Sequence, residues 1–230
     1  MNSSRDRILA RVREGLGREV PYTAHEVEQA RTAELDGAPA PRPLWTGAVL
    51  DRFLERYTAA AGTCSRVGSP AGAVEAIVAY LRERKLALSV RLAPHPVLRA
   101  LPWPEGFDHP EDGNIAEARV GVSVAEAALA ETGTLVLCSG PESPTTLNFL
   151  PEYHVVVLRS HDVVGYMEDA WHRLRQRPEF PPRTVNFITG PSRTADVEQT
   201  IQLGAHGPRS LHVILLDEVD PAGTGQPVSK

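Results

Sequence analysis

The stretch Val155-Val-Val-Leu158 is a run of consecutive apolar residues, most of them β-branched. Two similar runs flank it, Leu135-Val-Leu137 earlier in the chain and Val213-Ile-Leu-Leu216 later. Continuous apolar runs of this length are typical of strands that are covered on both faces, as in a parallel sheet between helical layers. They predict an α/β fold with three layers and one mostly parallel sheet.

The segments around these runs alternate between helix and strand patterns. Ser69-Pro70 predicts the start of a helix, because serine is a good N-cap and proline suits the first helical position. Val74, Ile77 and Leu81 form the apolar stripe of that helix. The predicted strands are 63–67, 86–90, 119–122, 134–138, 155–158, 185–189 and 211–216. The predicted helices are 4–14, 49–57, 70–81, 124–130, 145–149, 163–175 and 195–203, with one helical turn near 97–101.

The chain divides into an arm, a domain and a tail. Residues 1–45 are predicted to be an N-terminal helical arm with a charged run at 24–35 and a Pro-rich linker, since Gly37-Ala-Pro-Ala-Pro-Arg-Pro43 cannot sustain a helix. The arm is either a flexible extension or a segment that lies on a partner or second subunit. Residues 46–218 are the predicted α/β domain, and 219–230 are a Gly- and Pro-rich tail.

Composition bounds the function. The net charge of −5 and the pI near 5.9 give no general attraction for nucleic acid or anionic lipid. Cys64 and Cys138 are far apart, which predicts small core residues rather than a disulfide framework or a thiolate metal site. No histidine pair has the helical spacing of a metal site, and no apolar stretch resembles a signal peptide or membrane span. We expect a cytoplasmic protein without a metal.

Turns that connect strands to helices are the first places to search for a ligand site. Gly190-Pro-Ser-Arg-Thr-Ala-Asp196 follows a predicted strand, so Gly190, Ser192, Thr194 and Asp196 are candidates for binding an anion through backbone N–H groups and hydroxyls. The same side chains could instead cap the next helix. The segment lacks the glycine pattern of dinucleotide sites and the lysine of nucleotide-binding loops.

A second turn, Gly204-Ala-His-Gly-Pro208, contains His206 and Gly207. The imidazole of His206 could act as a general acid or base or hydrogen-bond a substrate, and Gly207 would lie beside the ligand. The glycines also suit a helix end and a tight turn without any ligand. A lone loop histidine such as His206 is more often exposed or structural than catalytic.

A third turn, Glu131-Thr-Gly-Thr134, joins a predicted helix to a very apolar strand. Glu131 is a candidate base or nucleophile because its carboxylate could be partly desolvated there, with Thr132, Gly133 and Thr134 beside the ligand. The alternative is a solvated glutamate at a helix end. Glu126, one helical turn earlier, competes for the same role.

Four motifs in one order, 121–137, 150–157, 190–198 and 204–208, resemble the LUD domain of the lactate-utilisation protein C (LutC/YkgG) family, over roughly residues 46–217. The resemblance implies a fold like that of the NagB/RpiA/CoA transferase group. It also implies a role beside A- and B-type iron–sulfur proteins in oxidising L-lactate to pyruvate. The clusters would then belong to the partners, with no cofactor in this chain and a small carboxylate or phosphate-containing ligand. The turn 144–149 lacks the arginine that family members often carry.

Two alternatives stay open at this point. In placement, Glu131 resembles the glutamate nucleophile of CoA transferases, so the chain could be a stand-alone enzyme acting on a CoA ester or a sugar phosphate. It could also be a non-catalytic assembly subunit. Association into homo-oligomers is compatible with each of these functions.

Overall fold

The computed structural model describes residues 4–15, 17, 23–26, 29, 42–110, 115–194, 202–203 and 206–217. Contacts divide the chain into two units, residues 1–43 and 44–230. In the first unit, helix α1 (Ser4–Gly15) confirms the predicted helix 4–14. Most of the predicted charged run, and the tail 219–230, lie outside the described residues.

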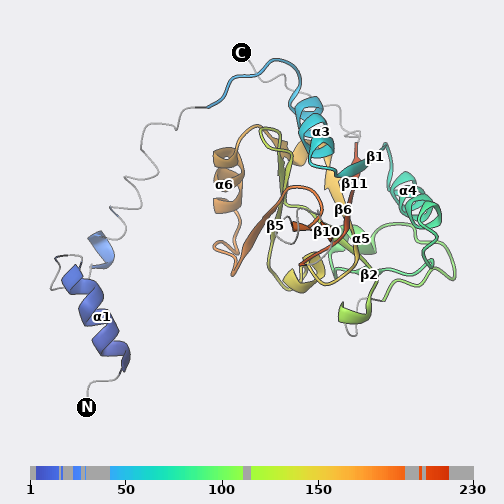
Figure 1. Ribbon diagram of the computed structural model, residues 1–230. Coiled ribbons are helices and arrows are strands. Elements are labelled where there is room, and N and C mark those ends of the chain that lie inside the picture. The colour runs from blue at the N-terminus through green and yellow to red at the C-terminus, as the bar shows by residue number, and fades with distance from the viewer. Residues whose placement is uncertain are drawn as a thin grey trace. The chain divides into compact units, whose positions relative to one another are not determined.

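The second unit contains the helices and strands of the α/β domain (Figure 1). None of the described helices is long and apolar enough to cross a bilayer. Its helices are α3 (Val49–Ala59), α4 (Pro70–Glu83), α5 (Pro96–Arg99), η1 (Ile115–Glu117), η2 (Thr145–Asn148), η3 (Ser160–Asp162) and α6 (Met167–Arg175). Its strands are β1 (Thr63–Val67), β2 (Arg91–Leu92), β3 (Val120–Val124), β4 (Ala127–Leu129), β5 (Thr134–Cys138), β6 (Tyr153–Arg159), β7 (Val163–Val164), β8 (Val185–Ile188), β9 (Arg193–Thr194), β10 (Gln202–Leu203) and β11 (Ser210–Leu216).

The central sheet has five strands in the order β1-β11-β6-β3-β2, and each pair is parallel. The apolar runs of β6 and β11 lie beside each other in this sheet and are buried on both faces, as predicted. On one face, α4 packs through Val74, Ile77 and Leu81, and the Ser69 side chain caps the helix by accepting the Gly72 N–H at 3.1 Å. The mostly parallel sheet with flanking helices confirms the predicted α/β class.

A second sheet, in the order β7-β4-β5-β8, covers the other face of the central sheet together with α3. Leu135 and Leu137 of β5 pack with Phe53 of α3 against the central strands. The outer face of the second sheet packs against α6. The layers are therefore α4, the central sheet, the second sheet with α3, and α6, and Figure 1 shows α4 and α6 on opposite sides. The sequence prediction did not include this second sheet.

The predicted helix 124–130 is wrong, because this segment forms the end of β3 and then β4. Ala127, Ala128, Leu129 and Ala130 have no exposed surface, so the segment has no polar side to turn toward solvent. Alternate residues pack on opposite sides, with Ala128 in one core and Ala127 and Leu129 in another. Pairing with β5 and β7 outweighs the helix preference of alanine.

Three other predicted boundaries change. The strand expected at 86–90 is displaced to β2, and within 86–90 Ser89 makes an isolated bridge to Asp108. The helix expected at 163–175 begins at Met167, because Val163 and Val164 pair with β4. The end of the helix expected at 195–203 is also wrong, since Gln202 and Leu203 pair antiparallel with β9. Residues 195–201 lie outside the described residues.

Candidate functional site

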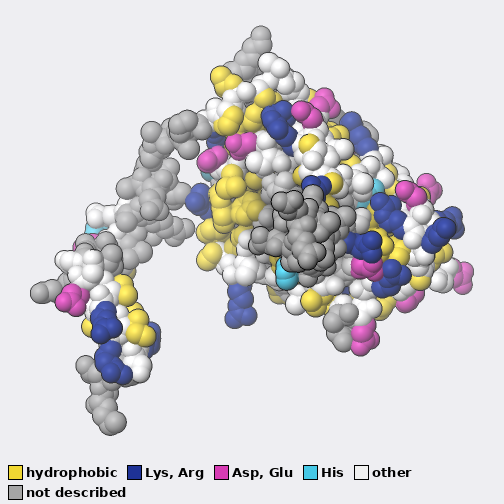
Figure 2. All heavy atoms as spheres, viewed as in Figure 1, with side chains coloured by type: hydrophobic (Ala, Val, Ile, Leu, Met, Phe, Trp, Pro, Cys, Tyr) yellow, Lys and Arg dark blue, Asp and Glu magenta, His cyan; other side chains and the backbone are white. Residues whose placement is uncertain are grey.

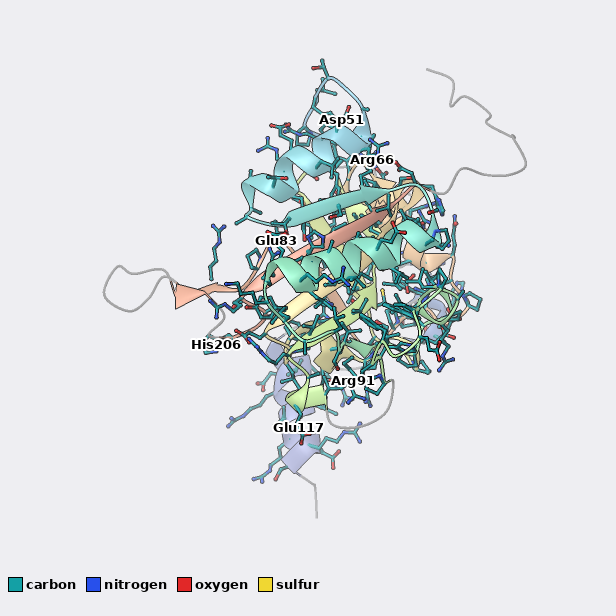
Figure 3. All side chains as sticks on the ribbon, turned by 90° about the vertical axis from the view of Figure 1, so that its right-hand side faces the viewer. Asp51, Arg66, Glu83, Arg91, Glu117 and His206 are labelled. Carbon is teal, nitrogen blue, oxygen red and sulfur yellow. The ribbon has the colours of Figure 1, made fainter. Side chains whose placement is uncertain are left out.

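A cavity of about 330 Å³ lies near the amino ends of β6 and β11, and we call it the amino-end cavity. Four of the predicted site residues line it: Gly190, Ser192, His206 and Gly207. His206 is exposed and lies at the rim of the domain, ahead of β11 (Figure 3). The backbone N–H of Ser192 donates to the carbonyl of Pro208 at 2.9 Å, which joins two of the predicted turns.

The turn at Gly190 lies at this edge because of strand direction. It follows β8, which runs antiparallel to β5 in the second sheet rather than parallel to the central strands. The turn therefore lies at the starts of β6 and β11, whereas ligand sites of parallel sheets are expected at the carboxyl ends of the strands. Arg193 and Thr194 form β9, and residues 195–201, where the helix was expected to begin, lie outside the described residues, so the anion site at a helix N-terminus stays a prediction.

Not all of the predicted residues meet at the cavity. Glu131, Thr132, Gly133 and Thr134 are not among its lining residues. Glu131 is half-buried, and its backbone N–H donates to the Gly165 carbonyl at 3.0 Å.

A line of hydroxyls connects the Glu131 turn to the cavity wall. The Thr134 hydroxyl lies 2.6 Å from that of Thr132 and 2.6 Å from that of Thr189, a cavity residue. Glu131 and His206 therefore stay separate as candidates. Asp196 lies outside the described residues, and of Thr194 only the backbone pairing with Gln202 is described.

Gly133 and Gly190 have a packing role that the sequence did not reveal. Gly133 and Gly190 both have a positive φ, +70° and +73°, and both pack closely against the carboxyl end of α3. A Cβ on Gly133 would lie 2.3 Å from the Tyr57 backbone N, and one on Gly190 would lie 2.1 Å from the Ala60 carbonyl O. These glycines allow the two turns to close on α3, which accounts for them without a ligand.

Asn148 and His154 are two buried polar cavity residues that the sequence interpretation missed as site residues. Asn148 is 1% exposed, and neither its amide N nor its amide O has a hydrogen-bond partner among the described residues. His154 is fully buried, with Nε2 2.7 Å from the Ser123 hydroxyl and Nδ1 without a described partner. Burial lowers the pKa of His154 to about 3, so its ring is neutral at pH 7.

Buried polar atoms are almost always hydrogen-bonded, so unpaired ones in residues that line a cavity are candidates to contact a bound molecule. The Asn148 amide offers a donor and an acceptor, and His154 Nδ1 offers one or the other according to its tautomer. At the rim, Arg193 adds a cation that also donates to the Ala60 carbonyl at 3.2 Å. The arrangement suits a small anion that also carries a hydroxyl or carbonyl group.

The sequence did contain a signal for these two residues. His154 immediately precedes the apolar run of β6, where a polar side chain must be buried with it. Asn148 ends the polar turn that becomes η2.

Cys64 and Cys138 belong to different parts of the core, as small buried or half-buried side chains. Burial raises the pKa of each thiol to about 11. The described residues contain no group of three or more His, Cys, Asp or Glu side chains arranged to hold a metal. Around the α/β domain, on the face seen in Figure 2, acidic and basic side chains of the described residues are interspersed.

Comparison with known proteins agrees with this architecture. The chain is similar to a DUF162 family protein from Deinococcus radiodurans, with a TM-score of 0.59 and 19% identity, over 76% of this chain and 99% of that one. That likeness supports the fold.

Matches to sequence relatives cover a shorter part of this chain than the structural match does. Lactate utilization protein C of Geobacillus thermodenitrificans is 36% identical over 105 residues, 44% of each chain. The uncharacterized protein YkgG of Escherichia coli is 34% identical over 140 residues, 59% of this chain and 60% of that one. The matched segments thus span about half the length of the curated relatives. Residues 113–216 match the LUD domain model. This part of the chain, which contains β3 to β11 and all the residues that line the amino-end cavity, is similar to the LUD domain family.

Proposed function

We propose that this chain is a lactate-utilisation protein that binds a small 2-hydroxy or 2-oxo carboxylate in the amino-end cavity. It would act as a subunit of a system that oxidises L-lactate to pyruvate. The family match and the name of relatives such as lactate utilization protein C support the pathway. The single observation that supports the site is the pair of buried, unpartnered side chains Asn148 and His154.

The chemistry of the cavity suits this ligand. The carboxylate would accept hydrogen bonds from Arg193 and from the Asn148 amide N–H. The ligand hydroxyl or carbonyl would then meet the Asn148 amide O or His154 Nδ1. A cavity of about 330 Å³ lies at the small end of the usual range for ligand sites, which favours a compact acid over a CoA ester.

Oxidation of lactate releases an electron pair, which must leave the site. The cysteines of this chain do not fit a cluster in it, because Cys64 and Cys138 are its only cysteines and pack in different core regions. We therefore assign the clusters to partner proteins of the A and B type. This chain would hold and orient the acid.

The test is a reconstituted oxidation. The full-length chain is mixed with the two iron–sulfur proteins, L-lactate and an artificial electron acceptor, and acceptor reduction is measured. We expect activity from the full mixture and a rate near background when this chain is omitted. Equal rates with and without the chain would exclude the subunit role.

Asn148→Leu separates binding from assembly. Leucine keeps the size of the side chain and removes an unsatisfied buried amide, so the variant should be as stable as the native chain or more stable by about 1–3 kcal/mol. Its complex should nevertheless lose lactate oxidation. Asn186→Leu is the matched control, because Asn186 also has an unpartnered amide N but does not line the cavity. Full activity of Asn148→Leu would instead favour a non-catalytic assembly subunit.

A further inference from the structure

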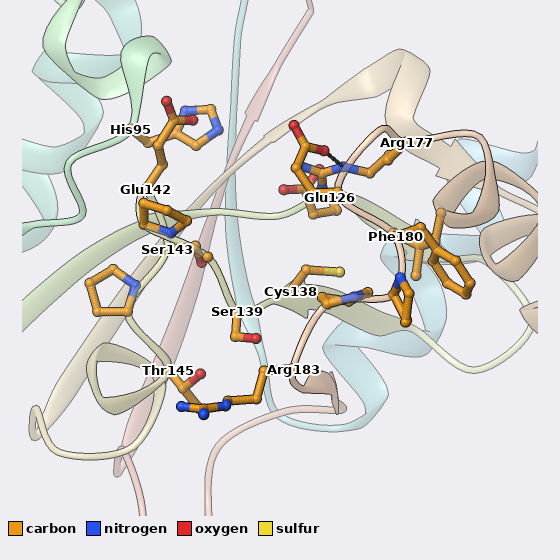
Figure 4. A pocket seen from close by; sticks show the side chains of 17 residues that line it. His95, Glu126, Cys138, Ser139, Glu142, Ser143, Thr145, Arg177, Phe180 and Arg183 are labelled. Carbon is orange, nitrogen blue, oxygen red and sulfur yellow. Dashed lines mark ion pairs between the residues drawn. The ribbon is translucent and has the colours of Figure 1, made fainter.

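A larger cavity, of about 690 Å³, opens beyond the carboxyl ends of β2 and β3, and we call it the carboxyl-end cavity (Figure 4). His95 follows β2, Glu126 follows β3, and Cys138 and Ser139 mark the end of β5. In open α/β sheets this is the edge where ligands usually bind. Of the candidates named from the sequence, Glu126, the competitor of Glu131, lines this cavity, whereas Glu131 and His206 do not.

One wall carries a fixed ion pair. Arg177 contacts the carboxylate of Glu126 and also lies 3.5 Å from that of Glu179. Figure 4 shows the Glu126–Arg177 pair on the side of the cavity opposite His95 and Glu142. Because Arg177 is already neutralised, it orders the wall rather than attracting an anion from solvent.

Two of the remaining polar groups can donate to a ligand, whereas the carboxylates of Glu142 and Glu179 lie beside His95 and on Arg177 respectively. The Ser139 hydroxyl accepts the Thr184 N–H at 2.8 Å, which leaves its own O–H free to donate. His95 Nδ1 accepts the Val97 N–H at 3.2 Å, so the proton of the neutral ring is on Nε2, and burial lowers the pKa of His95.

Arg183 lies at one end of the cavity, with Thr145, and is exposed. It forms no ion pair within the described part of the chain. A guanidinium group in this position is suited to carboxylate or phosphate.

A large part of the lining is apolar. The apolar residues are Leu174, Phe180, Pro141, Pro144, Pro181 and Pro182. A three-carbon acid would leave most of this volume and nearly all of the apolar lining without contact. The volume and the lining suit a ligand the size of an organic cofactor, with an apolar body to cover these side chains.

From these features we propose that the carboxyl-end cavity is a second binding site, for an organic anion with a planar or otherwise apolar body. The anionic group of the ligand accepts hydrogen bonds from the Arg183 guanidinium and the Ser139 hydroxyl. The apolar body of the ligand packs on Phe180 and Leu174. His95 Nε2–H donates to an acceptor at the far end. The site is separate from the amino-end cavity, so it holds whether or not the proposed function is correct.

The probe is 1-anilinonaphthalene-8-sulfonate, which combines a planar apolar body with a fixed anion. Its fluorescence is titrated with the folded full-length chain, and backbone amide shifts of the labelled protein locate the bound probe. We expect saturable binding at one site, with shifts in residues 139–145 and 177–183. Arg183→Ala should weaken binding at least about tenfold, because a charge-assisted hydrogen bond is lost. Arg175→Ala is the matched control, an exposed arginine outside the cavity that should leave affinity unchanged.

Competition with L-lactate separates the two sites. We expect excess L-lactate to leave probe binding unchanged, since lactate is assigned to the other cavity. Absence of saturable binding, unchanged affinity of Arg183→Ala, shifts elsewhere in the chain, or displacement of the probe by L-lactate would each overturn the second site. Failure of lactate oxidation in the reconstituted system would leave this result untouched.

Discussion

Replacing Gly190 or Gly133 by alanine should destabilise the domain through α3. Each glycine has a positive φ that L-residues adopt at a cost of about 1–2 kcal/mol, partly offset by about 0.4–1 kcal/mol from the lower entropy of the unfolded chain. The new Cβ would also lie 2.1 Å from the Ala60 carbonyl O or 2.3 Å from the Tyr57 N. These contacts are with backbone atoms, so α3 itself must shift, and overpacking of this kind costs about 1–3 kcal/mol. We expect each variant to lose about 2–4 kcal/mol.

Gly106→Ala isolates the packing contribution. Gly106 has a similar φ of +78°, but a Cβ there would have no neighbour within 4 Å. It should therefore lose about 1 kcal/mol from backbone strain alone. Urea unfolding followed by tryptophan fluorescence measures all three variants, and a common m-value would justify the comparison. If Gly133→Ala and Gly190→Ala lose no more stability than Gly106→Ala, these glycines are not required for packing against α3.

Three further predictions concern buried polar groups. Asp162 is 1% exposed and contacts Arg159 at 2.8 Å and also Arg173. Both arginine side chains are about one third exposed, so Asp162→Asn should lose about 2 kcal/mol of stability rather than the larger cost of a fully buried pair. Urea unfolding beside the exposed control Asp51→Asn tests this, and equal stabilities would contradict it. Burial lowers the pKa of His154 to about 3 and that of His212 to about 4. Below about pH 6.5 the unfolded chain therefore binds more protons than the folded chain. The free energy of unfolding should fall as the pH is lowered toward about 4, by up to about 1.4 kcal/mol per pH unit for each histidine. His212→Gln should show a smaller change of unfolding free energy with pH between about pH 7 and pH 4, and an unchanged slope would refute this. Burial raises the thiol pKa of Cys64 and Cys138 to about 11, so iodoacetamide should modify both thiols slowly in the folded chain and quickly in urea. Similar modification rates in the folded and the urea-unfolded chain would show that the thiols are accessible.

The sequence predicted the parts of the fold that depend on local patterns. The runs in β6 and β11 are covered on both faces because a central parallel strand has no solvent side. The helix cap at Ser69 is equally local, and the structure confirms it.

The second sheet depends on contacts that local patterns do not encode. Residues 124–130 are rich in alanine and favour helix by propensity, but they are buried between two layers and pair with β5 and β7. The direction of β8 follows from the same pairing, and it moves the Gly190 turn to the amino edge of the central sheet.

The candidate site was predicted only in part, because some of its residues share a local turn pattern and others depend on long-range packing. Turn composition identified Gly190, Ser192, His206 and Gly207, which the structure brings around one cavity. Asn148 and His154 were not identified, since their unpartnered atoms become visible only when distant segments pack around them. A role for Glu131 stays a prediction.

The most direct measurement is calorimetric titration of L-lactate into the full-length chain and its Asn148→Leu variant. We expect saturable binding by the native chain and at least about tenfold weaker binding by Asn148→Leu, at equal or higher stability of the variant. Arg183→Ala, in the other cavity, should bind lactate as the native chain does. Native-like binding by Asn148→Leu, or no binding by the native chain, would contradict the assignment of the amino-end cavity as a lactate site.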